Sequence, residues 1–129
     1  MKPKPLGFPK RVRLLKRFEF RRVYDEGVTP PVHNAGFHLF TYPKEGQTPS
    51  RLGLTVTRAV GNSVMRNRLR RWARETYRTT LVAQVAPEYD LVLNFHRNLA
   101  TRSRRDFDRL LTQVFEKAGL LKQANLPVD

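Results

Sequence analysis

The sequence predicts an α+β fold, a single-domain α/β sandwich in which helices pack on a mixed central sheet of about four strands. The first observation is a strand, a basic helix and another strand in succession over residues 51–95, which indicates a β-α-β unit. The second is that helical patterns flank this unit at both ends of the chain, over 11–27 and 103–119. With 129 residues, of which 40% are hydrophobic, the chain has enough apolar surface for one modest core.

The first predicted helix runs from Arg11 to Gly27 and is amphipathic. Phe20, Val23 and Tyr24 fall on one face at helical spacing, and Gly27 stands where a left-handed C-cap is expected. The other side of this helix is cationic and carries Lys16, Arg17, Arg21 and Arg22.

The segments predicted as strands differ in how their apolar residues are arranged. A short strand is expected at about Val32, and a firm one over residues 36–42, with Phe37 and Leu39 on the face opposite His38 and Phe40. Residues 51–57 alternate in the same way and are expected to form a hairpin with residues 36–42. Residues 89–95 hold three consecutive apolar residues, which indicates a strand buried on both faces.

The central helix is predicted from about Val64 and should fade after Leu81. Gly61, Asn62 and Ser63 supply the turn and the N-cap. Winding the segment at 100° per residue gathers one apolar arc, made of Met65, Leu69, Trp72, Ala73 and Tyr77. The remaining arc is basic and consists of Asn67, Arg68, Arg70, Arg71, Arg74 and Arg78, whereas Arg66 falls inside the apolar arc.

The charge of this helix indicates a polyanionic partner. Arginines recur every four residues from Arg66 to Arg78, a spacing at which like charges repel one another. Glu75 is the one acidic residue in this helix to offset them. The net charge is +14, and no acidic residue occurs over 1–18 or 46–74. Guanidinium groups match phosphates bidentately and stack on bases, so a nucleic acid is favoured over an anionic membrane surface.

The C-terminal helix is marked by a capping box, Ser103 with Asp106, and by a stop at Gly119. Residues 1–10 are expected to be a mobile basic arm and residues 122–129 a flexible tail. This leaves residues 11–121 as the domain expected to bind nucleic acid.

The residue types argue against chemistry carried by the protein itself. His33, His38 and His96 lack metal-ligand spacing, cysteine is absent, and the central stretch has one carboxylate, Glu75. No Gly-rich phosphate loop and no apolar run of about 20 residues is present. We therefore expect a cytoplasmic protein that does not bind a membrane or a small-molecule substrate. We also expect that the protein alone binds no metal ion. A DNA-binding helix module is a weaker reading, because the sequence has no helix-turn-helix pair.

The stretch GLTVTRAVGNSVMRNRLRRWARE, residues 53–75, closely resembles the protein subunit of bacterial ribonuclease P. That family has a strand, then Gly-Asn, then Arg-Asn-Arg at the start of a basic helix, and the resemblance extends over about residues 11–121. It implies the element order α-β-β-β-α-β-α and a left-handed crossover in the β-α-β unit, against the usual rule.

The resemblance also implies a function. The family's protein is the non-catalytic subunit of a ribonucleoprotein endoribonuclease that removes the 5′ leader from precursor tRNA. Its partners are the catalytic RNA and precursor tRNA, and the RNA phosphates hold the Mg²⁺ ions. No catalytic residue is expected in the protein. The alternative from another class is a ribosomal or RNA-chaperone protein without any enzymatic complex.

Two sets of site residues follow from the resemblance and the helical arcs. The surface for the RNA subunit is assigned to Asn62, Arg66, Asn67, Arg68, Arg70, Arg71 and Arg74. Asn62 and Arg66 fall toward the inward arc of the helix. Each of them could therefore contact the substrate, the cleavage site or the core of the protein. The cleft for the leader is assigned to Phe20, Tyr24, His38, Phe40 and Thr55, with the basic residues Arg13, Lys16, Arg17 and Arg58.

Some aromatic and basic positions are read differently. Phe37 and Trp72 are expected in the core. Ala59 stands where the family commonly has a second basic residue, and Leu15 replaces a lysine. Residues 94–97 replace a commoner Ala-Lys-Lys type ending of the last strand, which leaves the roles of His96 and Arg97 open.

Overall fold

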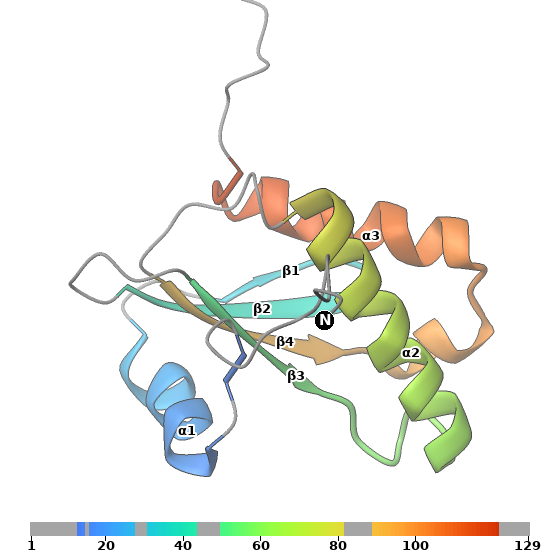
Figure 1. The fold of residues 1–129 in the computed structure, drawn as a ribbon, viewed down its shortest axis with the longest axis horizontal. Helices are drawn as coiled ribbons and strands as arrows, with labels where there is room; N and C mark the ends of the chain where they lie inside the picture. Colours follow the sequence, from blue (N-terminus) through green and yellow to red (C-terminus); the bar gives the residue numbers. More distant parts are fainter. Residues whose placement is uncertain (1–12, 15, 28–30, 44–49, 82–88, 122–129) are drawn as a thin grey trace, which may run out of the picture.

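The protein is an α+β sandwich built on one four-stranded sheet (Figure 1). The computed structural model describes residues 13–14, 16–27, 31–43, 50–81 and 89–121. Their regular elements are α1 (Arg17–Glu26), β1 (Val32–His33), β2 (Phe37–Pro43), β3 (Arg51–Thr55), α2 (Ser63–Thr76), β4 (Tyr89–Phe95) and α3 (Arg104–Lys117). A turn of π-helix over 77–81 continues α2, and a 3₁₀ helix over 97–101 leads into α3.

The strand order in the sheet is β1-β2-β4-β3. β4 pairs antiparallel with β2 and parallel with β3, so β3, α2 and β4 form the predicted β-α-β unit. The predicted hairpin between residues 36–42 and 51–57 is wrong, because β4 lies between those two strands. Leu91, Val92 and Leu93 are fully buried, and a strand that is apolar on both faces is stable at the centre of a sheet. The hairpin partner of β2 is the short strand β1.

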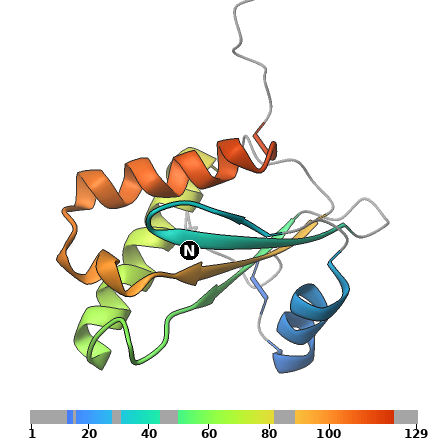
Figure 2. The same cartoon turned by 180° about the vertical axis from the view of Figure 1, so that it is seen from behind.

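Helices cover both faces of the sheet (Figures 1 and 2). On one face, α2 and α3 pack over the larger core, to which β2 contributes Phe37 and Leu39. On the other face, α1 lies over a small core centred on Val23 and Val92. The alternation predicted for β2 therefore holds, because Phe40 packs beneath α1 while Phe37 lies in the larger core.

The start of α1 differs from the prediction. The helix begins at Arg17 rather than Arg11. Arg13 and Leu14 lie instead along the free edge of β3, where Arg13 forms a parallel bridge with Leu52 and the Leu14 amide donates to the Leu52 carbonyl at 3.0 Å. The Glu19 carboxylate accepts the Lys16 backbone N–H at 3.2 Å and so caps the first turn.

The end of α1 also differs. Gly27 has φ −63° and ψ 135°, so the predicted left-handed cap is wrong. A Cβ at Gly27 would lie 2.7 Å from the Thr41 carbonyl oxygen and 2.9 Å from that of Val23. Glycine is required here for close approach of the chain rather than for positive φ.

The caps of the other two helices agree with the sequence pattern. Asn62 Oδ1 accepts the Met65 N–H at 2.9 Å at the start of α2, and Ser103 Oγ accepts the Asp106 N–H at 3.1 Å at the start of α3. Gly119 has φ 73° just after α3, as predicted. The predicted arm, residues 1–10, and tail, residues 122–129, lie outside the described residues. No helix in the described part of the chain is long and apolar enough to cross a membrane.

Candidate nucleic-acid interface

The face of the sheet beside α1 carries a cluster of four side chains, which we call the Tyr24 cluster: Tyr24, Phe40, Thr55 and Asn94. The Tyr24 hydroxyl donates to Asn94 Oδ1 at 2.8 Å and lies 3.0 Å from Thr55 Oγ1. Its ring meets Phe40 edge to face, with centroids 4.8 Å apart. Tyr24 is still 38% exposed, so the cluster presents aromatic and amide surface to solvent.

Other predicted leader residues surround this cluster. His38 pairs across the strands with Asn94, is exposed, and lies with its ring 5.1 Å from that of His33. Arg17 is exposed and stands two helical turns before Tyr24, on the same side of α1. Arg58 is exposed in the turn that follows β3, and Lys16 is exposed with its ammonium 6.0 Å from the Phe18 ring.

Phe20 is placed differently from Tyr24. Its ring packs in the small core with Leu14 and Val23 and lies directly over Gly53, where a Cβ would be 2.5 Å from the ring. Gly53 therefore makes room for Phe20, and much of the Phe20 ring is already used to hold α1 on the sheet.

A buried ion-pair group, the Asp90 lock, holds the other flank of α1. Asp90 is fully buried and accepts two hydrogen bonds from Arg51, at 3.0 and 2.9 Å, and one from Arg22 at 3.1 Å. Arg51 also binds Glu19 of α1 at 2.8 Å. The hydrogen bond with Asp90, followed by the one with Glu19, raises the pKa of Arg51 even though burial opposes it. The lock thereby fixes the position of α1 beside the Tyr24 cluster.

On α2, the predicted residues for an RNA partner fall into two groups. Asn67, Arg68 and Arg71 are exposed, whereas Arg70 and Arg74 are half-buried on the flank of the helix. Arg71 has one long contact, 4.0 Å, with Glu75.

Asn62 and Arg66, whose contacts the sequence did not decide, both form hydrogen bonds near the start of α2. Asn62 caps the helix, and Arg66 Nε donates to the Gly61 carbonyl at 3.1 Å. Both contacts order the turn before α2. Asn62 uses only its Oδ1 and Arg66 only its Nε in these contacts, so the other N–H groups of both side chains lie near the N-terminus of α2.

Arg70 and Arg74 meet Arg13 across the edge of β3. These three residues line a cavity of about 90 Å³, which we call the arginine pocket, with Leu14, Phe20, Leu52 and Leu54. Burial, followed by the charges of Arg13 and Arg70, lowers the pKa of Arg74. The structure thus brings Arg13, assigned from sequence to the leader, together with two residues assigned to the RNA subunit.

Asn94 of the Tyr24 cluster and Asp90 of the lock were not identified from the sequence, and both lie on β4. Asn94 and Asp90 follow the alternation of that strand, two residues on either side of Val92, and so point to the α1 face. A polar residue in an otherwise apolar strand is a detectable signal, because a buried polar group needs a partner. Because residues 89–95 were predicted to be buried on both faces, neither polar residue was assigned to a site.

The described residues contain no group of three or more histidine, aspartate or glutamate side chains that could hold a metal ion. Three carboxylates near the surfaces above are engaged by guanidinium groups. Glu19 and Asp90 bind Arg51, and Glu75 binds Arg104 at 3.1 Å.

Comparisons with known proteins agree on one family. The model of the family described as Ribonuclease P matches residues 8–119. The ribonuclease P protein component of Exiguobacterium sibiricum is 33% identical over 88% of this chain and 96% of its own length. That of Shouchella clausii is 36% identical over 87% of this chain and 89% of its own. The solved RNase P protein of Staphylococcus aureus superimposes with a TM-score of 0.77 at 24% identity, over 88% of this chain and all of that one, which shows a shared fold.

Proposed function

Because this chain belongs to the family of ribonuclease P protein components, we propose that it acts as the protein subunit of ribonuclease P on precursor tRNA. The enzyme removes the 5′ leader by hydrolysis of one phosphodiester bond. In this proposal the protein binds two RNAs on two surfaces, and the RNA subunit carries the chemistry.

The surface for the RNA subunit is the exposed side of α2 together with the arginine pocket. The observation that carries this assignment is the meeting of Arg13, Arg70 and Arg74 around one cavity whose described lining contains no carboxylate. Burial, followed by the charges of Arg13 and Arg70, lowers the pKa of Arg74, so a bound anion would favour the charged form of this side chain. A phosphate of the RNA backbone has the charge and the acceptor geometry that guanidinium groups bind bidentately. Asn67, Arg68 and Arg71 extend this surface along the helix.

The surface for the leader is the Tyr24 cluster with the cations beside it. Unpaired strands bind through aromatic side chains that stack on bases and through cations that follow the phosphates, without sequence readout. Tyr24 and Phe40 supply the rings, Asn94 supplies an amide, and Arg17 supplies an exposed charge. The Asp90 lock and Phe20 act as positioning groups, because they fix α1 and hence the Tyr24 ring.

The Mg²⁺ ions of the reaction are assigned to the RNA partner. Mg²⁺ prefers octahedral oxygen ligands and is commonly held through phosphates and one or two carboxylates. Glu19, Glu75 and Asp90 already bind guanidinium groups, so this donor set does not fit a Mg²⁺ site, and no step is assigned to a metal on the protein. The proposal also places the protein in the cytoplasm with its RNA partners.

Reconstitution tests the proposed function. The purified chain is added to a bacterial ribonuclease P RNA at a Mg²⁺ concentration too low for the RNA alone, and cleavage of precursor tRNA is followed. We expect cleavage at the 5′ end of the mature tRNA with both components present and none with the protein alone. Cleavage by the RNA-free protein would contradict the assignment of the chemistry to the RNA. RNA binding that neither stimulates cleavage nor depends on the leader would favour a ribosomal or chaperone-type protein.

A further inference from the structure

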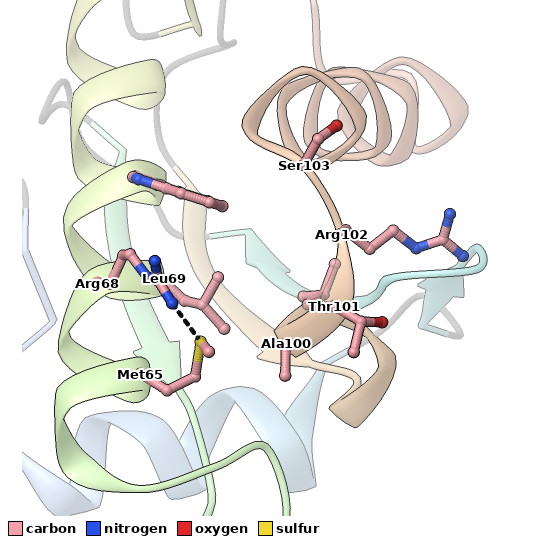
Figure 3. A pocket seen from close by; sticks show the side chains of 9 residues that line it. Met65, Arg68, Leu69, Ala100, Thr101, Arg102 and Ser103 are labelled. Atoms are coloured by element: carbon pink, nitrogen blue, oxygen red, sulfur yellow. Dashed lines mark hydrogen bonds between the residues drawn. The ribbon is translucent and has the colours of Figure 1, made fainter.

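A second cavity lies away from the Tyr24 cluster, between α2 and the segment that leads into α3 (Figure 3). Its volume is about 320 Å³, at the lower end of the range for small-molecule pockets. Met65, Leu69 and Trp72 line it from α2, and Leu99, Ala100 and Thr101 line it from the 3₁₀ helix. We call this cavity the Trp72 pocket.

The Trp72 ring is held firmly at this pocket. It meets the Phe107 ring edge to face, with centroids 5.4 Å apart, and the Arg104 guanidinium lies 5.6 Å from its centre. Arg104 is itself fixed by Asp108 at 3.0 Å and Glu75 at 3.1 Å. An indole held this way is a preorganised stacking surface, because little side-chain freedom remains to be lost on binding.

Arg68 stands at the mouth of the pocket and is weakly held. Its guanidinium lies 5.7 Å from the centre of the Trp72 ring and donates to Met65 Sδ at 3.4 Å (Figure 3). A thioether is a poor acceptor, so this contact costs little to exchange for a phosphate. Arg102, on the opposite wall, directs its guanidinium away from the cavity and binds Asp106 at 3.4 Å. The available positive charge is therefore on the α2 side.

We propose that the Trp72 pocket receives one unpaired base of the partner RNA, stacked on Trp72, while Arg68 binds the adjoining phosphate. This inference rests on the proposed function, since it assigns a base-binding site to the surface that faces the RNA subunit. An apolar peptide side chain would fill the cavity but leave Arg68 unneutralised. A nucleotide supplies both a ring for the indole and an anion for the guanidinium.

Filling the pocket from the protein side tests the proposal. Ala100→Phe places a ring in the cavity without changing charge, and Ala35→Phe places the same ring on the exposed turn between β1 and β2 as a matched control. Affinity for a bacterial ribonuclease P RNA is measured for both variants and the unaltered chain. Losing one stacked base weakens binding roughly 5- to 150-fold, which we expect for Ala100→Phe. Ala35→Phe is expected to stay within about twofold, as surface substitutions usually do.

Trp72 is the one tryptophan of the chain, so its fluorescence reports on the pocket directly. We expect the RNA to quench this fluorescence in the unaltered chain and much less in Ala100→Phe. If Ala100→Phe does not fold by circular dichroism, Thr101→Phe covers the mouth from an exposed position and takes its place. RNA affinity and quenching equal to those of the unaltered chain would overturn the proposal.

The two proposals fail in distinguishable ways. If the unaltered chain does not bind the ribonuclease P RNA at all, the proposed function fails. The quenching experiment is then repeated with single-stranded polyadenylate. Quenching that Ala100→Phe removes still supports a base-binding pocket, and no quenching, or equal quenching in both chains, overturns it.

Discussion

At the scale of single residues, Tyr24 and Asn94 show how a polar contact sets the position of an aromatic ring. The Tyr24 hydroxyl reaches two strands at once, through Thr55 of β3 and Asn94 of β4. These contacts hold the phenol ring against Phe40 and leave one part of it exposed. A ring fixed in this way loses little freedom when a base stacks on it, which favours binding without sequence preference.

A buried tyrosine on the opposite face gives a pH prediction. Burial raises the pKa of Tyr77 to about 12, from 10.0. Below pH 10 the phenol is protonated in both the folded and the unfolded chain, so its contribution to stability is fully present. Between about pH 10 and 12 the unfolded chain loses this proton while the folded chain keeps it, and stability falls by about 1.4 kcal/mol per pH unit.

The measurement is urea unfolding of the unaltered chain and of Tyr77→Phe at about pH 9 and about pH 11.5. The alkaline loss should be smaller in Tyr77→Phe, because the remaining titrating groups are common to both proteins. An equal loss in both would show that Tyr77 does not titrate as its burial implies.

At the scale of elements, the attachment of α1 depends on both of its flanks. Phe20 and Val23 pack it onto the small core, and the Asp90 lock ties Arg22 and Glu19 to the sheet through Arg51. The surface proposed for the leader includes side chains from α1 and from three strands, so it exists only while α1 is docked.

Asp90→Asn should therefore destabilise the protein strongly. Removing the Asp90 charge leaves Arg22 without this ion pair and Arg51 with Glu19 alone, which should cost about 1–3 kcal/mol in the free energy of unfolding. Asp106→Asn is the matched control, because Asp106 pairs with Arg102 and Arg109 at the surface and its loss should hardly change that free energy. Urea unfolding of both variants checks this. An equal small effect for both would mean that the lock does not hold the fold.

The elements also show what sequence reasoning can reach. Local patterns predicted α2, a cap within residues 61–63, the alternation of β2 and the burial of Leu91–Leu93 on both faces, because each depends on neighbours in the chain. The strand order was not predictable in this way. Pairing β3 with β4 rather than β2 depends on contacts between distant segments, and two strands that lie close in sequence do not reveal a third strand between them.

The candidate site also has one part that was predictable from the sequence and one part that depends on contacts between distant segments. The family motif assigned Tyr24, Phe40 and Thr55 to one site, and the structure brings these three together. The arginine pocket was not predictable, because Arg13 reaches α2 only after residues 13 and 14 align along β3. A helical wheel likewise places Arg70 and Arg74 on the outer arc, whereas the neighbouring edge of β3 half-buries both.

At the scale of the whole molecule, the net charge of +14 predicts that affinity for RNA depends strongly on salt. If some 6–10 phosphates are neutralised, affinity for the RNA subunit should fall about 10³- to 10⁵-fold between about 50 and 200 mM salt. Titrations at several salt concentrations measure this slope. A nearly flat dependence would mean that the arginines of α2 and the arginine pocket are not the binding surface.

We propose that one small domain binds two RNAs on two separate surfaces. Arg68→Ala with Arg71→Ala alters the α2 surface, and Tyr24→Ala alters the leader surface. The first variant should weaken assembly with the RNA subunit for all substrates alike. The second should leave assembly nearly unchanged and weaken binding of precursor tRNA by about 1–3 kcal/mol, the cost of one lost stack.

The most direct measurement is the affinity of the reconstituted holoenzyme for tRNA with and without a 5′ leader, for these two variants and the unaltered chain. Circular dichroism first establishes that each variant is folded. We expect Tyr24→Ala to lower affinity only for the substrate with a leader, and mature tRNA to bind as before. Equal loss for both substrates in the Tyr24 variant, or a leader-specific loss in the arginine variant, would contradict it.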